Sequence, residues 1–147
     1  MNKAARPGAV LAIDHGSKRA GFAVSDALRI SSQALESWRS HPAQPALLEH
    51  VAALLRERDV GIILVGLPLN MDGSEGPRTA EVRSFVRELA ARFPDLEVIA
   101  HDERLSTKAA EDMLREAGHH GAARRARRDS WSALVILQDW IACGEPR

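Results

Sequence analysis

Two short apolar segments, residues 10–13 and 60–65, constrain the fold of this 147-residue chain most strongly. Neither alternates apolar with polar side chains, and an uninterrupted apolar run of this length is typical of a strand covered on both faces. The first run ends abruptly at Asp14-His15-Gly16. Strands of this kind occur in α/β proteins, where helices cover both faces of a sheet that contains parallel strands. We therefore expect an α/β fold.

The surrounding segments favour an early β-hairpin followed by alternating helices and strands. Residues 21–24 have the pattern of a second strand, and polar residues 17–19 suit a tight turn between it and the first. A weaker strand pattern covers residues 29–35, and a short one covers residues 97–100. Helices are predicted after Pro45, after Pro77, from Ser106 to Gly118, and from Asp129 onward. This order predicts a mixed sheet with an antiparallel first hairpin and helices on both faces.

Length and composition indicate one globular domain. Hydrophobic residues make up 45% of the chain and charged residues 27%, and one domain takes roughly 100–200 residues. The prediction is a single domain over residues 1–147, with flexible ends at 1–7 and 143–147. The single cysteine, Cys143, excludes an internal disulfide, and no apolar stretch approaches the roughly 20 residues that cross a bilayer. A cytoplasmic location without membrane contact is therefore expected.

Three acidic residues stand where a predicted apolar element stops or starts. Asp14 follows the first strand, Glu103 follows the strand at 97–100, and Asp129 opens the last helix. Strand ends and helix starts are where sheets of this kind meet ligands. If folding gathers these carboxylates, their repulsion calls for a cation, and carboxylate oxygens suit Mg²⁺ or Mn²⁺. Two such ions about 3.5–4 Å apart can activate a water and stabilise the leaving oxygen of a phosphodiester, which is nuclease chemistry.

Each acid also has a purely structural interpretation. Asp129 can be a helix N-cap, favoured by the helix dipole. Glu103 can form a surface ion pair with Arg104 or Lys108. Asp14 is the hardest to explain as structure, because an acid directly after four buried apolar residues needs a partner or a chemical role. Asp14 is therefore the strongest of the three candidates for a catalytic metal ligand.

Basic residues near these acids are candidate nucleic-acid contacts. Twenty Lys and Arg balance twenty Asp and Glu, so local clusters must supply any attraction to phosphate. One cluster is Lys18 and Arg19, in the predicted turn of the first hairpin. The other cluster, before the last helix, consists of Arg124, Arg125, Arg127 and Arg128. We expect both clusters to bind phosphates, with a solvated turn and a solvated connector as the alternative interpretations.

Four blocks of the sequence closely resemble those of the YqgF/RuvX family, and the resemblance spans nearly the whole chain. The blocks are residues 13–26 (IDHGSKRAGFAVSD), 65–73 (VGLPLNMDG), 102–107 (DERLST), and Asp129 with 133–138 (ALVILQ). The resemblance implies an RNase H-like fold with a five-stranded mixed sheet flanked by helices, similar to Holliday junction resolvases. It also implies that the family's acidic residues fall on Asp14, Glu103 and Asp129, with the adjacent Asp102 as a lesser candidate.

Members of that family are nucleases that process the 5′ end of precursor 16S ribosomal RNA, or Holliday junction resolvases. The resemblance therefore implies a metal-dependent endonuclease acting on structured RNA or branched DNA. Two alternatives remain open. One is a catalytically silent nucleic-acid-binding module of the same fold. The other is an actin-like nucleotide-binding phosphotransfer domain, for which 147 residues supply only one of the two domains required. The sequence decides neither between DNA and RNA nor between a monomer and a homodimer.

Overall fold

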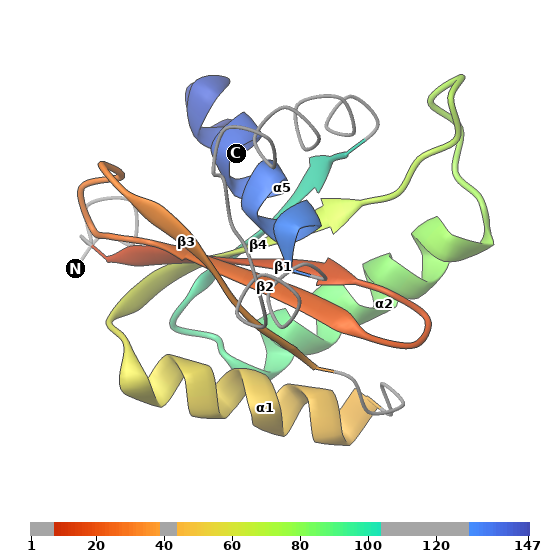
Figure 1. Cartoon of the computed structure of the whole chain (residues 1–147). Coiled ribbons are helices and arrows are strands. Elements are labelled where there is room, and N and C mark those ends of the chain that lie inside the picture. Colours follow the sequence, from red (N-terminus) through yellow and green to blue (C-terminus); the bar gives the residue numbers. More distant parts are fainter. Residues whose placement is uncertain (1–7, 39–43, 104–129) are drawn as a thin grey trace, which may run out of the picture.

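The computed structural model describes residues 8–38, 44–103 and 130–147, which form one five-stranded sheet with helices packed on it (Figure 1). The elements are β1 (Ala9–His15), β2 (Ala20–Ser25), β3 (Ser32–Trp38), α1 (Gln44–Glu57), β4 (Val60–Leu67), α2 (Pro77–Arg92), β5 (Glu97–Asp102) and α5 (Trp131–Ala142). The strand order is β3-β2-β1-β4-β5. Strand β2 pairs antiparallel with β1 and β3, whereas the β1–β4 and β4–β5 pairs are parallel. The predicted mixed sheet with an antiparallel first hairpin is confirmed.

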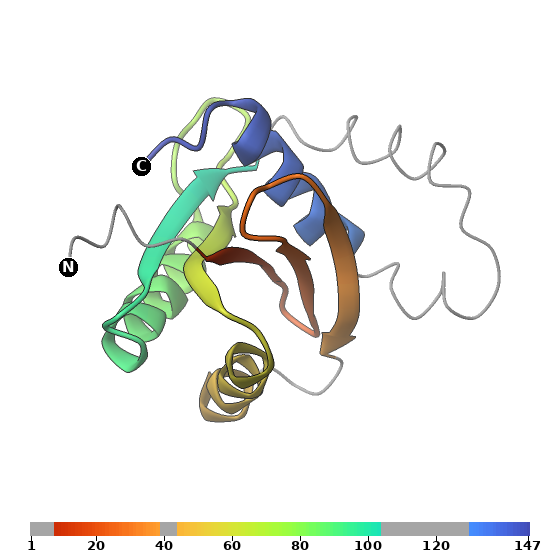
Figure 2. The same cartoon turned by 90° about the vertical axis from the view of Figure 1, so that its left-hand side faces the viewer.

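The alternation of side chains along β1 explains why its sequence is apolar without interruption. Leu11 and Ile13 pack in a core with α1 and α2, whereas Val10 and Ala12 pack in a second core with α5. All four are fully buried. Figure 2 shows α1 and α2 on one side of the sheet and α5 on the other. Helices therefore cover both faces, as predicted.

The same alternation sends the last two side chains of β1 to opposite faces. Asp14 lies on the α5 face, where the Ser132 hydroxyl hydrogen-bonds its carboxylate. His15 lies on the α2 face, and its ring centroid is 4.7 Å from that of Phe85. The end of β1 thus contacts one helix from each side of the sheet.

One predicted strand is shifted along the chain. Strand β3 covers 32–38 rather than 29–35, because residues 26–31 form the turn that follows β2. Asp26 Oδ1 accepts hydrogen bonds from the backbone N–H groups of Ile30 (2.7 Å) and Ser31 (3.0 Å) and closes this turn. Arg29 has a φ of 60°, a left-handed conformation that does not fit a strand. The helix predicted at 106–118 lies outside the described residues.

The C-terminal residues 143–147, expected to form a flexible end, make defined contacts in the structure. Trp140 Nε1 donates a hydrogen bond to the Pro146 carbonyl at 2.9 Å. Arg147 forms an ion pair with Glu97 at 2.9 Å. Among the helices that the structure describes, none has the length and apolar character needed to cross a membrane.

Candidate active site

Two of the three predicted acids lie at the edge of the sheet where the parallel strands end. Asp14 is the penultimate residue of β1, and Glu103 directly follows β5. Because β1, β4 and β5 are mutually parallel, their carboxyl ends meet at one edge (Figure 1). The Glu103 N–H donates a hydrogen bond to the Leu67 carbonyl at 3.3 Å, which fixes the chain as it leaves β5 against the end of β4. The structure therefore brings Asp14 and Glu103 to the same edge.

Gly66 of β4 makes room for the Glu103 carboxylate. A Cβ atom at position 66 would lie 2.4 Å from Glu103 Oε2 and 2.4 Å from Ile136 Cδ1 of α5. Real Cβ atoms do not come this close to their neighbours. The absence of a side chain at Gly66 therefore lets Glu103 reach across β4, under α5 and toward Asp14.

Burial and mutual repulsion perturb both carboxyl groups. Burial and, secondly, the negative charge of Asp14 raise the pKa of Glu103 to about 7, and Asp102 adds to the same effect. Burial also raises the pKa of Asp14. The Ser132 hydroxyl and the positive charges of Arg78 and Arg19 oppose that rise. A half-buried pair of mutually repelling carboxyl groups has the electrostatics of a cation site or of an acid–base pair.

Two serines fix the start of α5 beside the Asp14 carboxylate. The buried Ser130 Oγ accepts a hydrogen bond from the Phe22 N–H of β2 at 3.0 Å. Ser132, one residue into the helix, hydrogen-bonds Asp14. Ser130 occupies the N-cap position of α5, where the sequence predicted Asp129. Asp129 itself lies outside the described residues.

Arg78 also lies at the site, although nothing in the sequence beyond its residue type indicates this role. It is the second residue of α2, and its Nη2 donates a hydrogen bond to the His15 main-chain carbonyl. The same nitrogen lies 3.4 Å from His15 Nδ1, while Nη1 binds the Glu81 carboxylate. The positive charge of Arg78 opposes the rise in pKa of both Asp14 and Glu103. One guanidinium therefore acts on the whole carboxylate pair.

The structure describes one of the two predicted phosphate-binding clusters. Lys18 and Arg19 are exposed in the β1–β2 turn, which a hydrogen bond from the Gly16 N–H to the Arg19 carbonyl closes at 2.9 Å. This turn starts at the end of β1, next to Asp14. The arginine cluster at 124–128 lies outside the described residues. Their phosphate-binding roles stay predictions.

No complete metal site is seen in the described part of the chain. Within residues 8–38, 44–103 and 130–147, no group of three or more His, Cys, Asp or Glu side chains is arranged to hold a metal ion. Asp14 and Glu103 supply two of the three predicted metal ligands. The predicted third ligand is Asp129.

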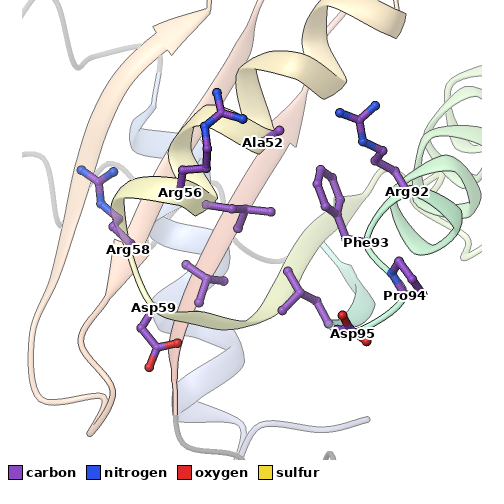
Figure 3. A pocket seen from close by; sticks show the side chains of 11 residues that line it. Ala52, Arg56, Arg58, Asp59, Arg92, Phe93, Pro94 and Asp95 are labelled. Atoms are coloured by element: carbon purple, nitrogen blue, oxygen red, sulfur yellow. The ribbon is translucent and has the colours of Figure 1, made fainter.

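A cavity of about 490 Å³ opens at the opposite edge of the sheet, between the C-terminal ends of α1 and α2 (Figure 3). Two of its arginines form ion pairs with glutamates. Arg92 pairs with Glu49 at 2.6 Å, and Arg58 pairs with Glu57 at 3.2 Å. Arg56 lies in the last turn of α1, where the helix dipole favours a cation. We therefore assign the candidate site to the carboxylate edge and not to this cavity.

Comparisons with known proteins agree with this assignment. The family described as "RuvX: Holliday junction resolvase" matches residues 8–143. A protein of Halalkalibacterium halodurans named "Putative pre-16S rRNA nuclease" is 43% identical over 132 residues, which cover 89% of this chain and 94% of that protein. Among solved structures, Thermus thermophilus RuvC in complex with Holliday junction substrate matches with a TM-score of 0.58 at 16% identity, covering 94% of this chain and 97% of that one. The fowlpox virus Holliday junction resolvase matches with a TM-score of 0.59 at 11% identity, covering 92% and 99%.

The architecture defines the class of protein as RNase H-like, with the fold of the Holliday junction resolvases. Within that class, the chain belongs to the RuvX family, which matches nearly its whole length. The predicted family, fold and nuclease function are confirmed at this level.

Proposed function

We propose that this protein is a divalent-metal-dependent endonuclease that hydrolyses phosphodiester bonds in structured nucleic acid. Asp14, Glu103 and Asp129 are its metal-binding and catalytic residues in this proposal. The observation that carries it is the juxtaposition of Asp14 and Glu103 across Gly66 at the carboxyl edge of the sheet. Carboxylates that repel each other in a desolvated site favour a bound cation, and their hard oxygen ligands suit Mg²⁺ or Mn²⁺.

The surrounding residues prepare the two acids for that role. The metal, when bound, supplies Lewis-acid stabilisation of the phosphate and a water of lowered pKa. Ser132 orients the Asp14 carboxylate through its hydroxyl, and the Leu67 carbonyl holds the backbone of Glu103. With a pKa of about 7, Glu103 exchanges its proton near neutral pH when no cation is present. A bound cation favours the ionised form of both acids.

We include Asp129 because of the contacts made by residues that closely follow it, Ser130 and Ser132. Consecutive Cα atoms are about 3.8 Å apart, and Ser130 is fixed to β2 by its buried hydrogen bond to Phe22. Ser132, three residues after Asp129, hydrogen-bonds Asp14. These contacts support a third carboxylate at the same edge.

Two substrates fit the chemistry and the relatives. One is the 5′ end of precursor 16S ribosomal RNA, and the other is a Holliday junction. Hydrolysis at the phosphate is common to both, and no described contact selects a 2′-hydroxyl or a base edge. In this proposal, the clusters at 18–19 and 124–128 bind phosphates that flank the cleaved bond. In this proposal the protein acts in the cytoplasm.

The test is cleavage of labelled four-way junction DNA and of precursor 16S ribosomal RNA, with Mg²⁺, Mn²⁺ or EDTA. We expect cleavage of at least one substrate with metal and none with EDTA. Asp14→Asn should abolish it, whereas Asp95→Asn, at an exposed acid on the opposite edge, should retain it. Equal activity of wild type and Asp14→Asn would refute the proposal.

The oligomeric state separates the two substrates further. Symmetric cutting of a four-way junction requires two active sites, whereas trimming of an RNA end requires one. We therefore expect a homodimer in solution if the junction is the preferred substrate. Mass measurement by light scattering, with and without each substrate, checks this. Efficient junction resolution by a strictly monomeric protein would contradict the link.

A further inference from the structure

Arg78 differs from the other ion-paired arginines described by the structure in its position, because its partly exposed guanidinium is fixed at the end of β1 beside Asp14. Its Nη2 donates to the His15 carbonyl, the main-chain group that directly follows Asp14. Its Nη1 binds Glu81, one turn further along α2. The side chain nevertheless keeps 37% of its surface exposed. The guanidinium group is therefore held at the carboxyl edge of the sheet without being enclosed by protein.

The position of Arg78 within α2 is unfavourable for helix stability. The first turn of a helix carries the positive end of the helix dipole and favours acidic residues. The first turn of α2 contains no acidic residue, and Arg78 adds a positive charge there. Arg92 lies in the last turn of the same helix, where a cation is favoured. The helix dipole thus favours Arg92 but not Arg78, whose partner within the helix is Glu81.

The chemistry of the guanidinium group fits an anionic ligand. Arginine has five N–H donors in a planar fork that matches two oxygens of a phosphate. Contacts to Glu81 and His15 use donors on Nη1 and Nη2, and the remaining N–H groups of this partly exposed side chain can bind a ligand. A phosphodiester approaching Asp14 and Glu103 meets two acidic groups, and a fixed cation beside them offsets the repulsion. The effect of Arg78 on the pKa of both acids supports this placement.

We propose that Arg78 binds the substrate phosphodiester next to Asp14 and Glu103 and orients it for cleavage. This inference rests on the proposed nuclease function of the same site. It assigns Arg78 a contact that the metal ligands do not make. The structural alternative is that Arg78 only ties α2 to the end of β1.

The test compares Arg78→Gln with Arg92→Gln, a matched arginine at the other end of α2 that also pairs with a glutamate. Binding of a fluorescently labelled four-way junction is measured by anisotropy in EDTA at several salt concentrations, so that the readout needs neither metal nor turnover. We expect Arg78→Gln to weaken binding by about tenfold and to lower the slope of log Kd against log salt by roughly one phosphate contact. Arg92→Gln should match wild type in both.

Arg78→Lys separates charge from geometry. Lysine keeps the positive charge but lacks the planar fork, so we expect it to restore the salt slope and to leave kcat at least tenfold below wild type. Thermal unfolding of each variant reports the structural role. If Arg78→Gln lowers the melting temperature but leaves the salt slope and Kd unchanged, Arg78 only connects α2 to the end of β1, and the inference is overturned. The nuclease proposal fails separately, through equal cleavage by wild type and Asp14→Asn.

Discussion

The carboxylate of Glu103 lies over the α-carbon of Gly66, on the neighbouring strand β4. A methyl group on Gly66 would meet Glu103 Oε2 on one side and Ile136 Cδ1 on the other, each at 2.4 Å. Any larger residue must therefore move the Glu103 carboxylate or the end of the Ile136 side chain.

Gly66→Ala is expected to reduce cleavage by about 100-fold, because small displacements of catalytic groups have effects of that order. Overpacking should also lower the free energy of unfolding by about 1–3 kcal/mol. Cleavage kinetics and urea unfolding measure the two effects. Gly76→Ala is the control, since a Cβ there would lie 3.4 Å from Asn70 Oδ1, an acceptable contact. Wild-type cleavage by Gly66→Ala would show that Glu103 is free to move.

The raised pKa of Glu103 predicts how stability depends on pH without divalent cations. Between its ordinary value of 4.5 and about 7, the folded protein retains a proton that the unfolded chain has lost. Stability contributed by this group therefore falls as the pH rises through that range. Asp14, whose pKa is also raised, acts in the same direction at lower pH.

Glu103→Gln removes the loss of stability that ionisation of Glu103 causes at high pH. At pH 8 the variant should be more stable than wild type by about 1–2 kcal/mol, a value reduced for partial exposure to solvent. At pH 4 the two proteins should have nearly equal stability. Urea unfolding in EDTA at both pH values measures the difference. Glu88→Gln, at an exposed position on α2, is the comparison variant. An equal gain in stability at both pH values would contradict a raised pKa for Glu103.

Divalent cations should stabilise the folded protein through the same acids. A ligand at 100 times its Kd that binds only the folded state contributes about 2.7 kcal/mol. We expect Mg²⁺ or Mn²⁺ to raise the melting temperature of wild type and EDTA to reverse the shift. Asp95→Asn should retain the shift, whereas Asp14→Asn should lose it. A shift of equal size in both variants would place the bound ion elsewhere.

Ser130→Ala tests how the start of α5 is held. The variant leaves the buried Phe22 N–H without its acceptor, which costs about 1–3 kcal/mol. Cleavage should fall as well, because the segment carrying Ser132 then loses its fixed position beside Asp14. Ser132→Ala is the comparison. Its side chain is exposed, so stability should change little, but the pKa of Asp14 should rise further and shift the pH–rate profile. Full stability of Ser130→Ala would rule out this anchoring role.

The arginine cluster at 124–128 should determine much of the salt dependence of binding, because the net charge of the chain is zero. Each phosphate contact to duplex DNA contributes roughly 0.9 to the slope of log affinity against log salt. Replacing all four arginines by glutamine should flatten that slope. Replacement of three arginines at the opposite edge, Arg56, Arg58 and Arg92, is the control and should leave the slope unchanged. An unchanged slope would mean that the cluster faces away from the substrate.

The strands and two of the acids could be predicted because their signals are local. An uninterrupted apolar run reports coverage on both faces, and β1 and β4 have that coverage. An acid at the end of such a run is costly without a partner, and this argument selected Asp14. The end of the short strand at 97–100 similarly indicated Glu103. The structure brings these two acids to one edge.

Other features depend on tertiary contacts that no local pattern reports. Arg78 contacts the end of β1 only because α2 packs against that strand end, so its sequence neighbours give no signal. Gly66 is needed only because Glu103 crosses it from another strand. The start of β3 depends instead on a nearby side chain, Asp26, which closes a turn where the apolar pattern suggested a strand. Distant partners therefore decide the first two features, and a local side-chain contact decides the third.

The opposite orientation of Asp14 and His15 on β1 limits how this chain can change over evolution. Substitutions among the apolar residues before Asp14 alter packing but keep each side chain on its own face. Insertion or deletion of a single residue there would swap the two faces, aiming an imidazole at Ser132 and a carboxylate at Phe85. The length of this segment should therefore be invariant among active relatives.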